Sequence, residues 1–192
     1  AGRSKRIAQS QDWLQQCKVA RNPSVRGFLA EAIVNSMLIQ DGLTLADKRH
    51  LKPAGAFSVF TNPPQLQLPL TGKECVFFEP EPFNYRRIDG LIRARDHGHT
   101  VFAPIQVTLS SPTDHKFSLD FFDEDYAAWV EGLDERQLKF VEWHFVWIVP
   151  KKHALRAAET GVRQGEEFAV KFTQLFLTFT QVDKRLAFLD DL

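Results

Sequence analysis

The stretch RRIDGLIRARDHGHTVFAPIQVTL, residues 86–109, decides the fold class of this chain. Apolar and polar side chains alternate along both of its halves, as they do in half-buried β-strands. His97-Gly98 lies between the halves, and glycine supplies the positive φ that a two-residue hairpin turn requires. The stretch therefore predicts a β-hairpin with one strand on either side of this turn.

Counting outward from the turn pairs Asp89 on the first strand with Gln106 on the second. Alternation also places Ile88, Gly90 and Ile92 on one face of the first strand and Asp89 on the other. A carboxylate and an amide then meet on one face of a hydrophobic hairpin, where oxygen ligands can hold a hard divalent cation. A longer turn would shift this register, so the pairing is a hypothesis about the turn as well as about the site.

Composition and length describe an ordinary globular chain. Its 192 residues, 44% hydrophobic with 17 Phe, suffice for one sizeable core. Two Cys without a CxxC pair indicate neither a disulfide framework nor a structural zinc site, and we expect reduced thiols in an intracellular protein. No apolar stretch approaches the roughly 20 residues of a membrane span. The chain does not begin with Met, so we expect a fragment of a longer protein with an upstream domain outside it.

Charge is balanced overall but unevenly distributed. The net charge of zero argues against an indiscriminate coat for nucleic acid. Residues 1–26 are predominantly basic, however, and can approach phosphates, whereas residues 120–135 carry acids and no base. A solvated face is the alternative interpretation of both segments, and part of the acidic run suits the first turn of a helix.

Two helices are predicted ahead of the hairpin. The first covers residues 4–19, with Ile7, Trp13, Leu14 and Val19 as its apolar positions. The second runs from a cap at Ser24 to about Gln40 and stops at Gly42. Glu31 lies at the rim of its buried face. The expected core stripe of this second helix is Val25, Leu29, Ile33 and Met37.

The remaining pattern completes a mixed α/β domain. Short strands are predicted at residues 57–61 and 75–78, a helix from about Ser118, and a buried strand over 140–149 that Pro150 ends. A short helix over 154–158 and a strand in the second half of the closing segment follow. We expect a basic N-terminal helical segment over residues 1–23 and a single α/β domain over residues 24–192.

The order of helix glutamate, strand aspartate and polar second strand resembles the PD-(D/E)XK, or restriction-endonuclease-like, superfamily. More narrowly, residues 85–150 are similar to the nuclease-like C-terminal domain of Crinkler effectors and of trypanosomal retrotransposon hot spot proteins. The similarity rests on GFLAEAIV (27–34), IDGLI (88–92), FAPIQVTLS (102–110), His115 and FVWIVP (145–150). It implies a restriction-endonuclease-like mixed sheet flanked by helices.

The resemblance implies a Mg²⁺-dependent endonuclease that cleaves DNA, within a Crinkler-type effector acting in the nucleus. Glu31, Asp89 and Gln106 would be its metal ligands, and Mn²⁺ would substitute for Mg²⁺. The ion would polarise the scissile phosphate and generate a hydroxide nucleophile. Gln106 stands where the superfamily usually has a carboxylate, and two negative charges in place of three should weaken Mg²⁺ binding.

Thr108 stands where the superfamily usually has a catalytic lysine, and threonine carries no charge. Lys116 and His115 are the first candidates to replace that lysine, followed by Arg86 and Arg87 beside Asp89. An ammonium stays charged at pH 7, whereas an imidazole is mostly neutral there and would suit a general base.

Two rival interpretations follow from the departures at Gln106 and Thr108. The first is a catalytically degraded nuclease fold that binds DNA or a host protein. The second is an interaction module whose acidic helix recognises a basic partner. This interpretation would be favoured if Asp89 and Gln106 lay on different faces of the hairpin.

Overall fold

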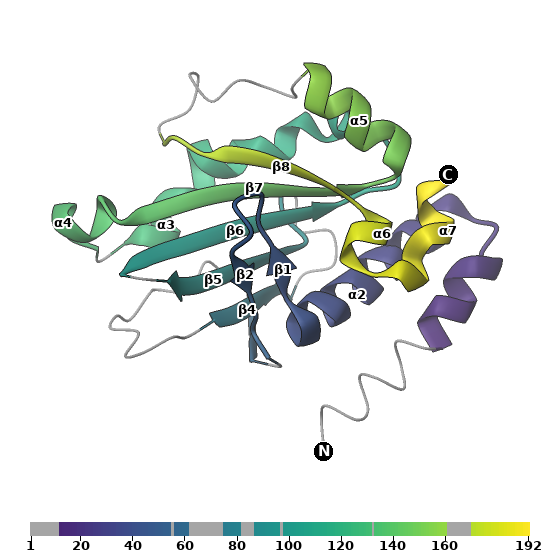
Figure 1. Cartoon of the computed structure of the whole chain (residues 1–192), viewed down its shortest axis with the longest axis horizontal. Helices are drawn as coiled ribbons and strands as arrows, with labels where there is room; N and C mark the ends of the chain where they lie inside the picture. Colours follow the sequence, from purple (N-terminus) through teal and green to yellow (C-terminus); the bar gives the residue numbers. More distant parts are fainter. Residues whose placement is uncertain are drawn as a thin grey trace.

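The computed structural model describes residues 12–54, 56–61, 75–81, 87–96, 98–131, 133–160 and 170–192. Within them the chain forms a six-stranded mixed sheet flanked by helices, in the strand order β3-β4-β5-β6-β7-β8 (Figure 1). The strands are β3 (Phe57–Phe60), β4 (Cys75–Pro80), β5 (Gly90–Asp96), β6 (His99–Val107), β7 (Val141–Val149) and β8 (Thr173–Thr178). The predicted α/β class is confirmed.

Strand direction decides which chain segments meet. β4, β5 and β6 form an antiparallel meander, β3 runs parallel to β4, and β7 and β8 run parallel to β6. The carboxyl ends of five strands therefore lie at the same end of the sheet, together with the amino end of β5. We call this the carboxyl end of the sheet; the arrowheads of β6 and β7 point to it at the right of Figure 1.

The hairpin has the predicted register. Asp96 pairs with His99 across the turn and Gly90 pairs with Ile105, so Asp89 falls opposite Gln106. Gly98 adopts a φ of +89°, as the two-residue turn requires.

The predicted alternation ends at the start of the strand. Ile88 packs with Leu91 on the face of the sheet that helix α3 (Tyr126–Val130) covers, whereas Ile92 packs on the opposite face. Placing Ile88 with Ile92 was therefore wrong, because the regular strand begins only at Gly90. A side chain at Gly90 would lie 2.4 Å from the ring of Phe77, so only glycine lets β4 and β5 pack this closely.

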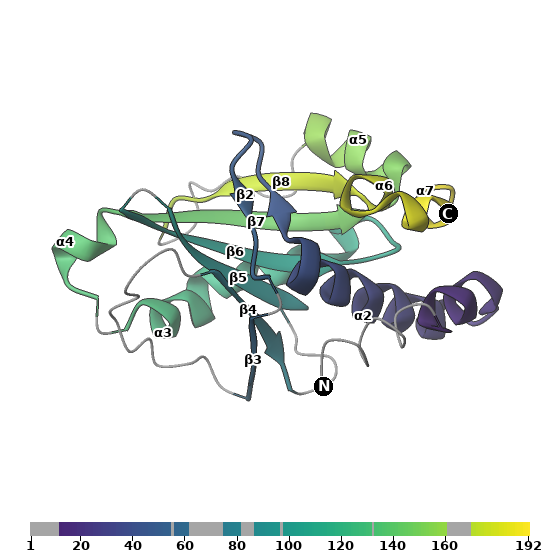
Figure 2. The ribbon, with the colours of Figure 1, turned by 60° about the horizontal axis from the view of Figure 1, so that its bottom comes forward.

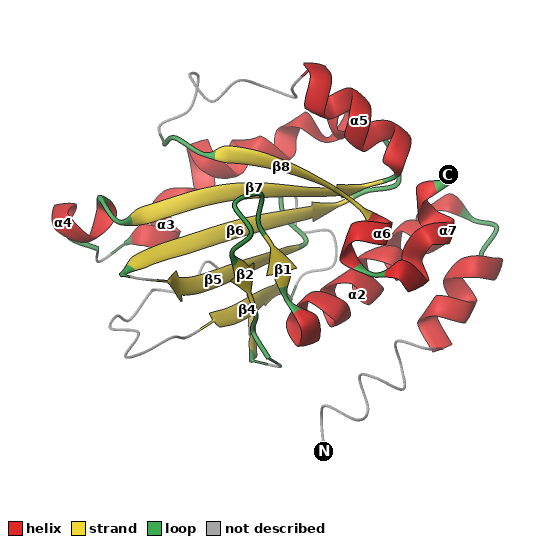
Figure 3. Ribbon diagram, viewed as in Figure 1, coloured by secondary structure: helices red, strands yellow, loops and turns green. Residues whose placement is uncertain are grey.

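The two faces of the sheet are covered by different layers (Figure 3). An aliphatic core joins one face to a helix over residues 12–19 and to the elements at the front of Figure 1. These elements are α2 (Pro23–Asp41), the hairpin of β1 (Leu43–Thr44) and β2 (His50–Leu51), α6 (Phe179–Val182), η4 (Lys184–Leu186) and α7 (Ala187–Asp190). No described helix is long and apolar enough to span a membrane.

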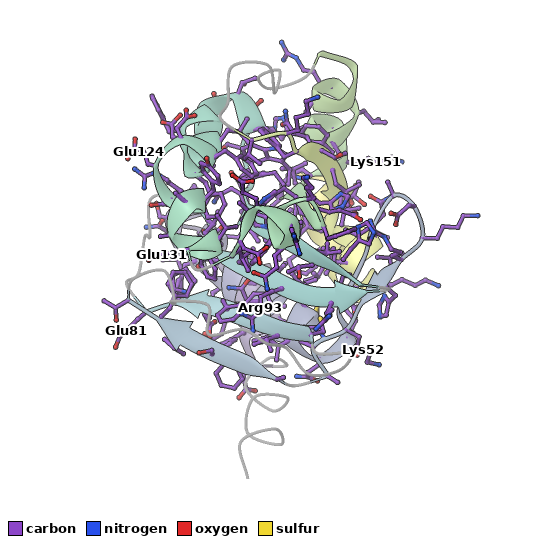
Figure 4. The ribbon with its side chains drawn as sticks, turned by 90° about the vertical axis from the view of Figure 1, so that its left-hand side faces the viewer. Lys52, Glu81, Arg93, Glu124, Glu131 and Lys151 are labelled. Carbon is purple, nitrogen blue, oxygen red and sulfur yellow. The ribbon has the colours of Figure 1, made fainter. Side chains whose placement is uncertain are left out.

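An aromatic core fills the other face. It lies under η1 (Pro112–Asp120), η2 (Phe121–Asp125) and α3 (Tyr126–Val130). The helical segment begins earlier than the predicted start at Ser118, because a 3₁₀ helix capped by Ser111 forms its first part. Glu124 and Glu131 project outward from this layer (Figure 4). The remaining helices are α4 (Glu135–Leu138) and α5 (Lys151–Thr160), which follows β7 directly after Pro150.

Helix α2 begins one turn before its buried stripe. Its cap is Asn22 rather than the predicted Ser24, because the Asn22 side chain accepts the Ser24 N–H at 2.9 Å and Pro23 suits the first turn. Val25 is 48% exposed, so the core stripe begins at Leu29. Likewise Val19, expected in the core, is 67% exposed, and the predicted position Ile7 lies outside the described residues.

Candidate functional site

A pocket of about 250 Å³ opens at the carboxyl end of the sheet. The first half of α2 forms one wall, and the end of β4 and the start of β5 form the other; Figure 2 shows α2 extending past the strands at this end. Four acidic residues line the pocket, and the described lining includes no basic residue. The lining consists of Trp13, Phe28, Glu31, Ala32, Asn35, Glu79, Pro80, Glu81, Ile88 and Asp89.

Asp89 is held on the sheet side of this pocket by several hydrogen bonds. Its main-chain N–H donates to Ile105 at 2.8 Å, which continues the hairpin ladder. Its Oδ2 accepts the main-chain N–H of Val107 and the amide nitrogen of Gln106, both at 2.6 Å. The carboxylate therefore accepts one main-chain N–H and one side-chain amide from the end of β6, and these two bonds fix its orientation.

Gln106 acts behind Asp89 in this arrangement. Its Nε2 donates to Asp89, and its Oε1 accepts the Ser118 hydroxyl at 2.9 Å. The amide oxygen, the atom of this side chain that can bind a hard cation, thus accepts one hydrogen bond from η1. The expected closeness of Asp89 and Gln106 is confirmed; Gln106 holds the Asp89 carboxylate and is not part of the pocket lining, and its role as a metal ligand stays a prediction.

Glu31 and Asp89 approach the pocket from opposite walls. Burial, and after it the negative charge of Glu79, raise the pKa of Glu31 to about 7. Burial and the charge of Glu31 hold the pKa of Asp89 well above its ordinary range, although the Val107 N–H acts in the opposite direction. The carboxylates repel one another, and a cation between them would relieve that repulsion.

Glu79 is the site residue that the sequence analysis missed. It belongs to no recognisable motif and lies on a short strand before a proline. It reaches the pocket because Phe78 pairs with Leu91, which brings the end of β4 beside the start of β5. Only strand order, which the residue pattern does not encode, could have identified it.

Asn35 links the two walls of the pocket. One turn after Glu31 on α2, its Nδ2 donates to the main-chain oxygen of Asp89 at 2.9 Å. Its Oδ1 is buried and has no hydrogen-bond donor among the described residues, and the residue is 2% exposed. A buried acceptor without a donor lowers the free energy of unfolding by about 1–3 kcal/mol. Asn35 lines the pocket, so this loss of stability indicates a role in the function of the site.

The carboxylates fit a hydrated divalent ion rather than a closed protein cage. Among the described residues, no three acidic, histidine or cysteine side chains lie close enough to hold a metal by themselves. Mg²⁺ is commonly bound by one or two carboxylates, with waters and substrate phosphates completing its shell. Glu31, Glu79 and Asp89 supply carboxylates of the required chemistry.

His115 belongs to a neighbouring hydroxyl cluster and does not line the acidic pocket. Its Nε2 lies 3.0 Å from the Thr108 hydroxyl and 2.9 Å from that of Ser110, at the end of β6. Burial lowers the pKa of His115, which the charge of Asp114 only partly opposes. The lowered pKa favours the neutral ring, the form in which His115 could act as a general base.

The other candidate cations separate into two groups. Arg87 pairs with Glu124 and, at 2.7 Å, with Asp125, so it ties the start of β5 to the helical layer instead of facing the pocket. Lys116 lies on η1, but its side chain is outside the described part of the chain, as is all of Arg86.

No family model, curated protein or solved structure matches this chain. The interpretation of the site therefore rests on its geometry and chemistry.

Proposed function

We propose that this chain is a Mg²⁺-dependent phosphodiesterase acting on DNA, with a restriction-endonuclease-like arrangement of its site. The observation that carries the proposal is the convergence of Glu31, Glu79 and Asp89 on one pocket whose described lining has no basic residue. Carboxylates that share one pocket repel one another, and a cation between them relieves that repulsion.

The order of elements supports the same proposal. A helix bearing Glu31 precedes an antiparallel meander, a crossover helical segment follows, and β7 returns parallel to β6. Asp89 and Gln106 lie on successive strands of that meander. This is the succession that the resemblance to restriction-endonuclease-like nucleases implies.

Each residue then has a distinct task. Asp89, Glu31 and Glu79 would hold the ion together with bound waters, and the ion would supply positive charge at the scissile phosphate and acidify one of those waters. Gln106 and the Val107 N–H orient the Asp89 carboxylate, and Asn35 holds the Asp89 backbone to the helix that carries Glu31. Such supporting hydrogen bonds keep a site within its productive geometry.

Incubation of purified protein with plasmid and linear DNA tests the proposal directly. Cleavage is expected with Mg²⁺ and at least equally with Mn²⁺, which tolerates weaker ligand sets, and EDTA should abolish it. Asp89→Asn should remove the activity, whereas Glu131→Gln, an exposed acid on the far helical layer, should retain it. Cleavage by Asp89→Asn at the wild-type rate would assign the activity to another site or to a contaminant.

One observation favours a second candidate, a non-catalytic module of the same fold that binds DNA or a protein. The position usually held by a lysine is Thr108, whose hydroxyl contacts Ser110 and His115. Absence of cleavage with every divalent ion, combined with retained DNA binding, would support this candidate over the enzyme.

A further inference from the structure

The start of α5 lies at the same end of the sheet as the acidic pocket. β7 ends at Val149 and α5 begins two residues later, next to the end of β6, where the Thr108 N–H donates to Ile148 at 3.0 Å. In Figure 1, α5 begins at the tip of the β7 arrow. The order along this end is the pocket at β4 and β5, the hydroxyl cluster at β6, and then α5.

The charge along this end changes sign. The pocket is acidic, whereas the first turn of α5 carries Lys151 and Lys152, both exposed. Lys152 donates to the main-chain oxygen of Leu192 and lies at the surface. Burial is the main cause that lowers the pKa of the neighbouring His153, so the two lysines supply the cationic charge of this turn.

Spacing determines what these lysines can reach. β5 and β7 are separated by one strand, which puts the start of α5 roughly 10 Å or more from Asp89 across the sheet. That distance does not require contact with a phosphate held in the pocket. It fits a phosphate further along the same polynucleotide, with the hydroxyls of Thr108 and Ser110 in between.

We infer that Lys151 and Lys152 bind a backbone phosphate next to the one at the acidic pocket. The nucleic acid then runs along the carboxyl end of the sheet, from β5 across β6 to α5. This inference rests on the proposed function and adds the path of the substrate. It also accounts for DNA binding by a chain without net charge, because cations are needed only where the phosphates pass.

Fluorescence anisotropy with a labelled DNA duplex in EDTA measures this contact without cleavage. The double variant Lys151→Gln/Lys152→Gln should weaken binding about 10-fold or more and reduce the log–log salt slope by about 0.9 for the lost phosphate contact. The matched control is Lys139→Gln/Lys171→Gln, which removes two exposed lysines just before β7 and β8, at the opposite end of the sheet. The control should bind like the wild type.

The variant Lys151→Arg/Lys152→Arg keeps the charge and should restore both affinity and slope. Equal weakening in both double Gln variants, or unchanged binding by the α5 variant, would overturn the inference. Cleavage by the wild type together with unchanged binding by the α5 variant would refute the inference alone. Weakened binding without metal-dependent cleavage would refute the proposed function alone, and a wild type that binds no DNA would refute both.

Discussion

The two ends of the sheet handle charge in opposite ways. At the amino end of β7, the Oε2 atom of Glu142 lies 2.5 Å from Nη2 of Arg49, and its Oε1 atom lies 2.8 Å from Nδ1 of His99. The hydrogen bond from Arg49 is the main cause that lowers the pKa of Glu142. At the carboxyl end, Glu31 and Asp89 face each other without a cation in the described lining, and both have a raised pKa.

This difference separates a structural charge from a functional one. The Arg49 and Glu142 pair joins the β1–β2 connection to the sheet and serves the fold itself. The acidic pocket has the reverse character, because burial and then neighbouring acidic charge raise the pKa values of Glu31 and Asp89. Perturbed groups in a pocket are typical of ligand sites, which a protein keeps at a cost in stability.

Among the variants that compare the two ends of the sheet, Glu79→Gln should have the largest effect. Loss of one carboxylate from the pocket should lower Mg²⁺ affinity, and the cleavage rate at subsaturating Mg²⁺, by about 100-fold, at the upper limit seen for supporting groups. Glu142→Gln should leave cleavage unchanged. Initial rates across a Mg²⁺ titration measure both variants, and similar rates for the two would remove the distinction between the ends of the sheet.

Glu31→Gln should stabilise the metal-free protein at pH 8. With a pKa of about 7 against an ordinary 4.5, folded Glu31 retains a proton that the unfolded chain has released, so stability falls as pH rises from 4.5 through 7. The variant lacks this loss, which is on the order of 2 kcal/mol above pH 7. Urea unfolding in EDTA should show the gain at pH 8 and none at pH 4; a destabilised variant at pH 8 would contradict it.

Asn35→Leu should weaken Mn²⁺ binding about 10-fold, since it removes the support of the Asp89 backbone. Ser36→Ala is the control, because Ser36 is also buried on α2 but does not line the pocket. Electron paramagnetic resonance of free Mn²⁺ measures the affinity. Equal affinity in Asn35→Leu and the wild type would show that the link between the two walls is not needed.

The smallest effect, a change in the free energy of unfolding, is expected at the amino end of β7, where Glu142 pairs with Arg49. Glu142→Gln should destabilise the protein by about 1 kcal/mol or less at pH 7, because an ion pair that is partly open to solvent contributes little. The pKa of Glu142 is lowered, so its contribution is present above its ordinary 4.5 and is lost as pH falls through the lowered value. Thermal unfolding at pH 7 and at low pH checks this; a loss that persists at low pH would assign it to packing.

Local sequence rules determined the hairpin and much of the sheet. Alternation and one turn glycine were enough to place Asp89 opposite Gln106, because a two-residue turn leaves only one register. The strand ended by Pro150 and the helix stop at Gly42 followed from the same local chemistry. The cap at Asn22 and the exposed Val25 were missed, since burial of the first turn depends on where the helix crosses the sheet.

The sequence by itself determined which residues could carry metal chemistry, and it placed Glu31 and Asp89 among them. Only the tertiary structure decided that Glu79 joins them and that Gln106 turns its oxygen toward Ser118. The physical reason is that a sequence pattern describes only residues that are close together in the chain. A strand pattern specifies the face and register of neighbouring residues, whereas strand order and the packing of η1 bring together side chains that are distant in the chain.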